Sequence, residues 1–309
     1  MSTDRLRHAY RPATDSWYAQ LDELPTDPAP SVAHAPADQA QGLRRLFTSR
    51  TMRCIPVVSN PGIAFGGALL ERLCSAYAEQ GLRTLVVDAG ENARAPAELA
   101  SFDLAEGVEV LSPHVSYLAA RGLALRFVDA GGSTSSFFDA IADAAPDVDV
   151  LLVHASAADL ARLFARRVQE LQAGAVRPIV LCDEQADSVT HAYAAIKLLV
   201  TRAGLMAHDL LFSAVPDSPR AAQVAERLAR CADDFLGAAL HDWVAVDPTE
   251  APTDGPSLRL KRLAREQLAC ALPYTVSDSV FGALAGEIGA RSALPSLTPR
   301  HGARSPWSR

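Results

Sequence analysis

Residues 55–70 read IPVVSNPGIAFGGALL, an apolar strand followed by a glycine-containing turn and the apolar start of a helix. In nucleotide-binding proteins, a strand, a Gly-rich turn and a helix in this order surround phosphates with backbone N–H groups. Such a loop also uses a lysine to neutralise phosphate charge and a Ser or Thr hydroxyl to hold Mg²⁺. The whole chain has two lysines, Lys197 and Lys261, and neither is near the turn. The stretch therefore predicts the shape of a phosphate-binding loop without its chemistry.

Short apolar runs alternate with helical patterns after this stretch. Near-continuous apolar strands between helices indicate a mostly parallel sheet with helices on both faces, so the sequence predicts a doubly wound α/β domain. The expected strands are Ile55–Ser59, Thr84–Asp88, Val108–Leu111, Ala124–Val128, Val150–His154, Ile179–Cys182, Leu210–Ala214 and Trp243–Val246. The expected helices cover residues 66–80, 115–122, 134–144, 157–172, 187–202, 217–236, 257–271 and 277–291.

Four segments are expected along the chain. Residues 1–37 are polar and punctuated by proline, which predicts a flexible arm. Residues 38–50 begin with a capping Asp38 and place apolar residues on one face, which predicts a short amphipathic helix. The α/β domain is expected over residues 51–291, and the Pro- and Ser-rich residues 292–309 are expected to be disordered.

Composition excludes several classes of protein. A formal net charge of −7 argues against a protein that coats nucleic acid, so no nucleic-acid partner is expected. No apolar run approaches membrane-spanning length, and the first residues lack the apolar region of a secretory signal. Five widely spaced cysteines without a C-x-x-C pair favour reduced core thiols and no metal cluster. A cytoplasmic protein is expected, with a peripheral position at the inner face of the membrane or at a cell pole as the variant.

Three strings of residues resemble those of the MinD/ParA family of deviant P-loop ATPases, and in particular its flagellar-number regulator (FlhG) branch. DQAQGLRRL at 38–46 is similar to that branch's N-terminal DQAxxLR motif. TLVVDAGEN at 84–92 resembles the strand that ends in the family's switch, and IVLCDEQADSVTHAYAAIKLL at 179–199 resembles a stretch typical of the flagellar branch. The resemblance covers residues 36–290 and implies a P-loop NTPase fold and a regulator of bacterial flagellar number or placement.

The same resemblance places glycine or proline where the family's ATPase chemistry would be. Its signature lysine falls on Pro61, its phosphate lysine on Gly66 and its Mg²⁺-binding hydroxyl on Gly67, while Gly62 is kept. The expectation is therefore a pseudo-ATPase with no catalytic residue of its own and no bound ATP or Mg²⁺. The vestigial cofactor positions are Gly62, Gly66, Gly67 and Asp88.

Further departures lie on the two neighbouring strands. The switch aspartate falls on Gly90, although Asp88 is kept, and the acid expected after the strand at residue 150 is His154. Asp88 is expected to cap the following turn instead of binding metal. His154 is interpreted as a hydrogen-bonded histidine that closes a strand, with a replacement ligand or base as the alternative.

The residues implied to act on a partner are in the N-terminal helix: Asp38, Gln39, Ala40, Leu43 and Arg44. The resemblance implies that they stimulate FlhF, an SRP-type flagellar GTPase. A carboxamide donates and accepts hydrogen bonds, so Gln39 can orient the attacking water in the partner's GTP site. Flagellar basal-body or regulatory proteins are the other expected partners.

Alternatives remain at this point. The chain could be a divergent but active MinD/ParA-type ATPase that positions cargo or partitions DNA, or a non-enzymatic scaffold. The helix at residues 257–271 has leucines on one side and arginines toward the other, so it could attach to an anionic membrane. Packing of its apolar side on the domain is favoured, which leaves weak or no membrane association.

Overall fold

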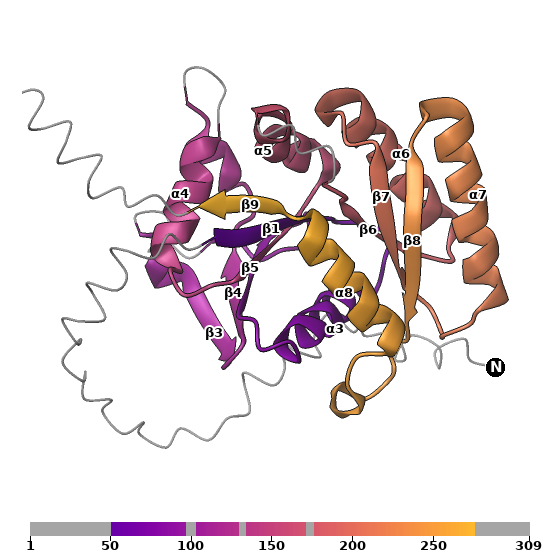
Figure 1. The fold of residues 1–309 in the computed structure, drawn as a ribbon, viewed down its shortest axis with the longest axis horizontal. Helices are drawn as coiled ribbons and strands as arrows, with labels where there is room; N and C mark the ends of the chain where they lie inside the picture. The colour runs from indigo at the N-terminus through magenta and orange to yellow at the C-terminus, as the bar shows by residue number, and fades with distance from the viewer. Residues whose placement is uncertain (1–50, 97–102, 130–133, 171–175, 276–309) are drawn as a thin grey trace, which may run out of the picture. The chain divides into compact units, whose positions relative to one another are not determined.

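In a computed structural model, the described residues are 51–96, 103–129, 134–170 and 176–275. They form an α/β domain around one sheet, in the strand order β3-β4-β2-β5-β1-β6-β7-β8, with β9 paired to β1 (Figure 1). The strands are β1 (Thr51–Val58), β2 (Thr84–Ala89), β3 (Val108–Ser112), β4 (Val115–Ala119), β5 (Val150–Ala155), β6 (Ile179–Asp183), β7 (Ala207–Ser213), β8 (Ala239–Val246) and β9 (Leu272–Thr275).

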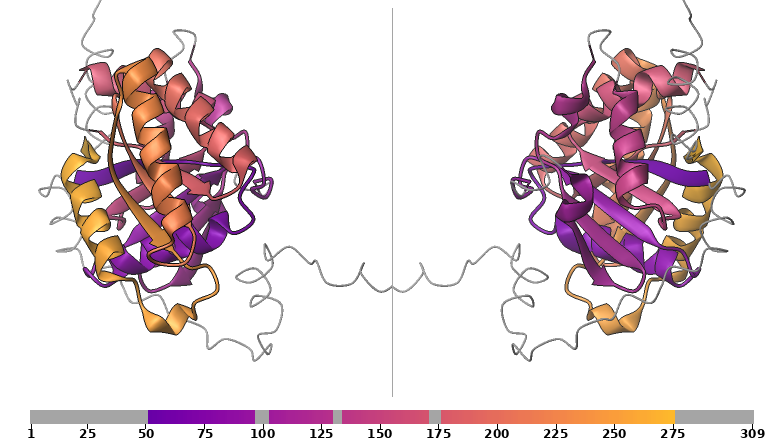
Figure 2. Two further views of the ribbon diagram at one scale, coloured as in Figure 1. Left: turned by 90° about the vertical axis from the view of Figure 1, so that its right-hand side faces the viewer. Right: turned by 90° about the vertical axis from the view of Figure 1, so that its left-hand side faces the viewer.

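The described helices mostly connect parallel strands. They are α3 (Gly66–Ala78), α4 (Ser135–Ala144), α5 (Ala157–Glu170), α6 (Ala186–Ala203), α7 (Pro219–Leu236) and α8 (Leu258–Cys270), with short 3₁₀ turns at Leu104–Gly107, Ala124–Phe127 and Pro252–Asp254. The connection from β1 through α3 runs to β2, whereas the connections through α5, α6 and α7 run the other way along the sheet. Right-handed crossovers in opposite directions put their helices on opposite faces, so the predicted doubly wound architecture is confirmed (Figures 1 and 2).

Continuous burial on both faces explains why the central strands lie in the middle of the sheet. Residues of β5 from Val150 to Val153 are all fully buried, as are Ile55 and Val57 of β1. On one face, α3 and α8 pack together over these strands, and their leucines join the same hydrophobic core. A strand that is apolar on both sides thus needs a helix layer on both sides, which this fold supplies.

Two predictions between residues 115 and 128 are wrong. Residues 115–119 form strand β4, not a helix, and Ala124–Phe127 is a 3₁₀ turn, not a strand. β4 pairs in parallel with β2 and antiparallel with β3. The run VSYLA has the β-branched and aromatic residues of a strand, and a short turn after Ser112 folds it against β3. The local sequence of residues 115–119 is compatible with a helix or a strand, and pairing with β2 selects the strand.

The C-terminal helix is confirmed as a core-facing helix. Leu260, Leu263 and Ala264 of α8 are buried, and Ser257 caps the helix by accepting a hydrogen bond from the N–H of Leu260. Directly after this helix, Leu272 begins β9, which pairs antiparallel with the start of β1. No helix among the described residues combines the length and apolar character that crossing a bilayer requires. The N-terminal arm, the helix expected at 38–50, the helix at 277–291 and the terminal tail lie outside the described residues.

Candidate functional site

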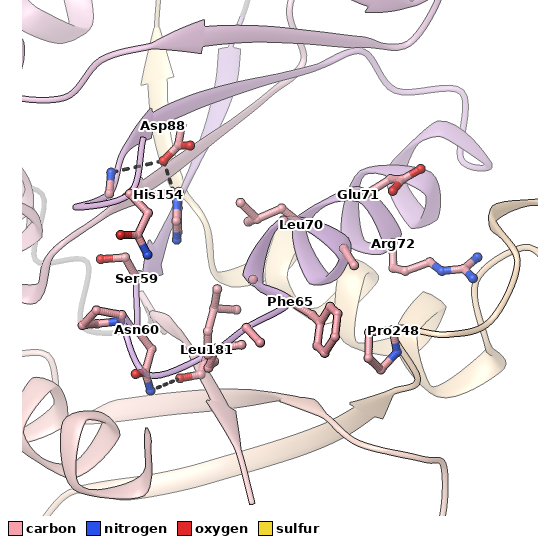
Figure 3. Close-up of a pocket in the computed structure, with 18 of the residues that line it drawn as sticks. Ser59, Asn60, Phe65, Leu70, Glu71, Arg72, Asp88, His154, Leu181 and Pro248 are labelled. Atoms are coloured by element: carbon pink, nitrogen blue, oxygen red, sulfur yellow. Dashed lines mark hydrogen bonds and ion pairs between the residues drawn. The ribbon is translucent and has the colours of Figure 1, made fainter. Parts of the chain in front are cut away.

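A cavity of about 670 Å³ opens at the carboxyl ends of the central strands, beside the loop that joins β1 to α3. This is where the direction of the crossovers reverses, which is the usual ligand position in a doubly wound sheet. Loop residues 59–61 and 63–65, the start of α3, the ends of β2 and β5, and residues 248–251 after β8 surround it (Figure 3). The fold therefore places the sequence-predicted loop, Asp88 and His154 around one cavity.

The loop after β1 is held by the side chain of Asn60, which is 8% exposed. Its Nδ2 donates to the carbonyl oxygen of Leu181 at 3.0 Å (Figure 3) and to that of Ser188 at 2.9 Å. Its Oδ1 accepts from the N–H of Gly62 at 3.0 Å, and its backbone oxygen accepts from the N–H of Ile63 at 3.1 Å. Two backbone N–H groups of the loop are thus satisfied within the loop itself.

The first turn of α3 borders the cavity without a side-chain cap. Phe65 occupies the N-cap position, and no side chain there accepts from the helix N–H groups. Gly66 and Gly67 follow it and line the cavity. A Cβ on Gly66 would come no closer than 3.9 Å to Leu181, so the space would accept a side chain. The glycine at this position is therefore not required by packing.

Asp88 and His154 form a hydrogen-bonded pair on adjacent strands. Nδ1 of His154 lies 2.8 Å from Oδ1 of Asp88, and this oxygen also accepts from the N–H of Gly90 at 3.1 Å. Oδ2 of Asp88 accepts from the hydroxyl of Tyr117 on β4 at 3.1 Å. Burial opposes ionisation of the carboxyl, but the hydrogen bonds and the charge interaction with His154 outweigh it, so the pKa of Asp88 is lowered.

This pair bears directly on two interpretations made from the sequence. The N–H of Gly90 confirms that Asp88 caps the following turn, and the bond to Asp88 confirms that His154 is a hydrogen-bonded histidine at a strand end. His154 also lines the cavity. A Cβ on Gly90 would lie 3.0 Å from Cε1 of His154, so the imidazole occupies the space that a side chain at position 90 would need.

Arg72 is a cation of the cavity that the sequence reasoning did not single out. It lies on α3, is 5% exposed and lines the cavity. Its Nη2 donates to the carbonyl oxygens of Glu250 and Ala251 at 2.8 and 2.7 Å, and its Nη1 has no hydrogen-bond partner among the described residues. An arginine within the apolar run of α3 was the available signal. The side chain ties α3 to the loop after β8.

The charges around the cavity are mostly negative. Its lining includes four acidic residues, Glu71, Asp88, Glu91 and Glu250, and one permanently charged base, Arg72. Like charges raise the cost of placing a polyanion in a partly enclosed site. In the described part of the chain, no group of three His, Cys, Asp or Glu side chains could hold a metal ion. The electrostatics of the lining do not favour a triphosphate.

The vestigial cofactor positions are not all in one place. Gly66, Gly67 and Asp88 line the cavity, whereas Gly62 turns toward α6, where a Cβ would lie 3.2 Å from the backbone of Ser188. Gly62 instead lines a shallow depression of about 390 Å³ with Pro61, Asp187, Thr190 and His191. The partner-activating positions Asp38, Gln39, Ala40, Leu43 and Arg44 lie outside the described residues.

Comparison with known proteins gives structural similarities only. No family model and no curated protein matches the sequence. The MinD cell division protein of Aquifex aeolicus is 14% identical, with a TM-score of 0.43, over 70% of this chain and 95% of that chain. McdA of Cyanothece, in an ATP complex, is 10% identical, with a TM-score of 0.46, over 71% of this chain and 96% of that chain.

An enzyme is among the similar structures as well. Cobyrinic acid a,c-diamide synthase of Mycobacterium smegmatis, with bound ADP and magnesium, is 15% identical, with a TM-score of 0.45, over 80% of this chain and 100% of that chain. With identities and TM-scores this low, the similarities leave the ligand, activity and partners of this chain open.

Proposed function

We propose that this chain is a regulator of bacterial flagellar number or placement, similar to the FlhG branch of the MinD/ParA family, and that it does not hydrolyse ATP. Its work is to stimulate an SRP-type GTPase of the FlhF kind through residues 38–44. The domain at residues 51–275 would meanwhile contact flagellar basal-body or regulatory proteins. The proposal joins the sequence resemblance to the geometry of the cavity.

One observation carries the absence of ATP turnover. In the loop after β1, the N–H groups of Gly62 and Ile63 bind Asn60, so they are not free to surround a phosphate. Phosphoryl transfer relies on preorganised charges, and removing one such group typically costs about two to three orders of magnitude in rate. Here Pro61, Gly66 and Gly67 supply neither a cation nor a hydroxyl.

The neighbouring strands support the same conclusion. The carboxylate of Asp88 receives hydrogen bonds from His154, Gly90 and Tyr117, so three of its roughly four acceptor sites are already occupied by the protein. His154 stands at the end of β5, where the resemblance implies an acid. For these strands to support ATP hydrolysis, Asp88 would have to be released from its hydrogen bonds and His154 would have to be replaced by an acid.

Stimulation of a partner needs no nucleotide in this domain. The proposed mechanism places Gln39 beside the γ-phosphate in the partner's GTP site, where its carboxamide holds the attacking water in line. Asp38 and Arg44 would orient the helix, and Ala40 and Leu43 would supply its apolar contacts. A short segment on a long polar arm suits insertion into another protein, because it can reach the partner and order on binding.

GTP hydrolysis by a purified FlhF-type GTPase tests this function. We expect the full chain, and a peptide of residues Ala35–Thr48, to raise the rate about tenfold or more, as water-orienting groups do in GTPase sites. Gln39→Ala should abolish the stimulation, whereas Gln41→Ala, the same change two residues away, should preserve it. If neither the chain nor the peptide stimulates hydrolysis, the activator role is wrong and the scaffold interpretation takes its place.

A second candidate, a divergent MinD/ParA-type ATPase that positions cargo, is favoured by one observation. Arg72 lines the cavity and its Nη1 has no partner among the described residues, so a cation is present. Calorimetric titration of the full chain with ATP and Mg²⁺ separates the candidates. We expect no binding heat at millimolar nucleotide, and micromolar binding accompanied by phosphate release would favour the ATPase.

A further inference from the structure

The side chain of Asn60 connects parts of the chain that are more than a hundred residues apart. Its Nδ2 donates to the carbonyl oxygens of Leu181, at the end of β6, and of Ser188, in the first turn of α6. It also lies 3.1 Å from Oγ of Ser188. A buried amide that makes this many hydrogen bonds is held in a single orientation.

The oxygen of the same carboxamide accepts a hydrogen bond from the loop that contains Asn60. Its Oδ1 accepts from the N–H of Gly62, while the N–H of Ile63 reaches the backbone oxygen of Asn60. In a phosphate-binding loop, such N–H groups bind the oxygens of the ligand. Here an oxygen of the protein takes that place.

Ser188 completes the connection on the side of α6. It is fully buried, and its Oγ accepts from the N–H of Asp183 at 2.9 Å. Gly62 packs directly against its backbone, where a Cβ would lie 3.2 Å from both Cα and N of Ser188. Loop, strand end and helix start therefore fit together without any space for a further group between Gly62 and Ser188.

We propose that Asn60 acts as an internal ligand that permanently fixes the loop after β1 to β6 and α6. The set of hydrogen bonds from Asn60 to Gly62, Leu181 and Ser188 is called the Asn60 lock. The inference builds on the proposed function, in which the loop no longer takes a nucleotide. It adds the regulation of that site: the loop and the start of α6 hold one conformation permanently, so any partner that contacts them does so independently of ATP.

Amide hydrogen exchange of the full chain tests the lock. In the unmodified protein, we expect the N–H groups of Gly62 and Ile63 to be protected, and ATP with Mg²⁺ to leave their exchange rates unchanged. Asn60→Ala should speed their exchange about tenfold or more, because buried hydrogen bonds are lost on both sides of the loop. Asn92→Ala is the matched control, since Asn92 is exposed, lines the same cavity and makes no side-chain hydrogen bond to a described residue.

A second variant keeps the test sharp if Asn60→Ala does not fold. Asn60→Asp retains the oxygen that binds Gly62 but replaces the donor toward Leu181 and Ser188 with a second oxygen. It should loosen the amides at the start of α6 more than the amide of Gly62. Rapid exchange of Gly62 and Ile63 in the unmodified protein would overturn the lock, as would protection that appears only with ATP and Mg²⁺, or no effect of either variant.

Failure of the lock and failure of the proposed function are distinguishable. The GTPase assay depends on residues 38–44 and not on Asn60. A chain that stimulates the GTPase but shows a loop ordered by ATP would keep the activator role and lose the lock. A chain whose loop amides are protected but which does not stimulate the GTPase would keep the lock and lose the activator role.

Discussion

At the scale of single residues, the most unusual environment is that of His208 at the start of β7. Its side chain is fully buried, and neither ring nitrogen has a hydrogen-bond partner among the described residues. Desolvation lowers the pKa of His208 to about 4. The unfolded chain, with an ordinary histidine pKa, binds this proton at higher pH than the folded protein does. The free energy of unfolding therefore carries no penalty from His208 above the histidine pKa of the unfolded chain, and it decreases as the pH drops toward 4.

The prediction for His208 is a change in pH dependence. The difference between the two pKa values amounts to at most about 3 kcal/mol of stability lost on acidification. His208→Leu should remove this loss and be neutral or stabilising at pH 7.5, because it deletes two unsatisfied polar atoms. Urea unfolding of both proteins at pH 7.5 and pH 5 measures it. His191→Leu, at an exposed position on α6, is the control, and equal acid sensitivity of wild type and His208→Leu would contradict the argument.

At the scale of elements, α8 shows how an amphipathic pattern is used. Its leucines could suit a membrane surface, but in the fold they meet α3 and join the core. Its basic residues face outward and find local partners: Arg262 Nε lies 2.9 Å from Glu266, and Arg259 lies over the ring of Trp243. The helix is thus part of the domain, and its apolar face is buried in the core.

Two leucines of this helix separate a folding role from a surface role. Leu263 is fully buried, so Leu263→Ala should lower the free energy of unfolding by about 2–5 kcal/mol. Leu258, in the same helix, is 81% exposed, so Leu258→Ala should change it by about 0.5 kcal/mol or less. Chemical denaturation of the full chain compares them. Equal and small effects of both changes would mean that α8 does not pack as described.

At the scale of the whole molecule, the proposed function gives the cavity and the predicted partner-activating segment separate tasks. The MinD/ParA resemblance implies a dimer in which a lysine of one subunit reaches the nucleotide of the other. That position here is Pro61, which has no charge to donate. In the loop around it, Asn60 already accepts from the N–H of Gly62.

The corresponding prediction concerns assembly. The molar mass in solution should be the same with and without ATP and Mg²⁺, whatever oligomeric state the chain adopts. Size-exclusion chromatography with light scattering measures this on the full chain. Gly66→Lys together with Gly67→Thr, which restores two of the missing groups, should leave the result unchanged, because the loop N–H groups remain bound to Asn60. A nucleotide-dependent increase in mass for the unmodified chain would refute the prediction.

Much of the architecture was readable from the chain alone. Runs such as 55–58 and 150–153 are apolar on both sides, as is typical of a strand that helices cover on both faces. The alternation of these runs with helical patterns therefore determined a doubly wound domain. The absence of lysine between Ser59 and Leu70 was equally plain, because the identity of a residue needs no structure.

Other features were decided only by tertiary contacts. VSYLA became strand β4 because β2 offered an edge to pair with, and the four residues of β9 were missed because they pair with a strand more than two hundred residues away. Arg72 was visible only as an arginine within an apolar run, and the contact of Asn60 with Ser188 had no signal in the sequence. Periodicity records which side of an element is buried, but not what it is buried against. Only the folded sheet brings the packing partners together, and with them the hydrogen bonds of Asn60 that hold the loop after β1.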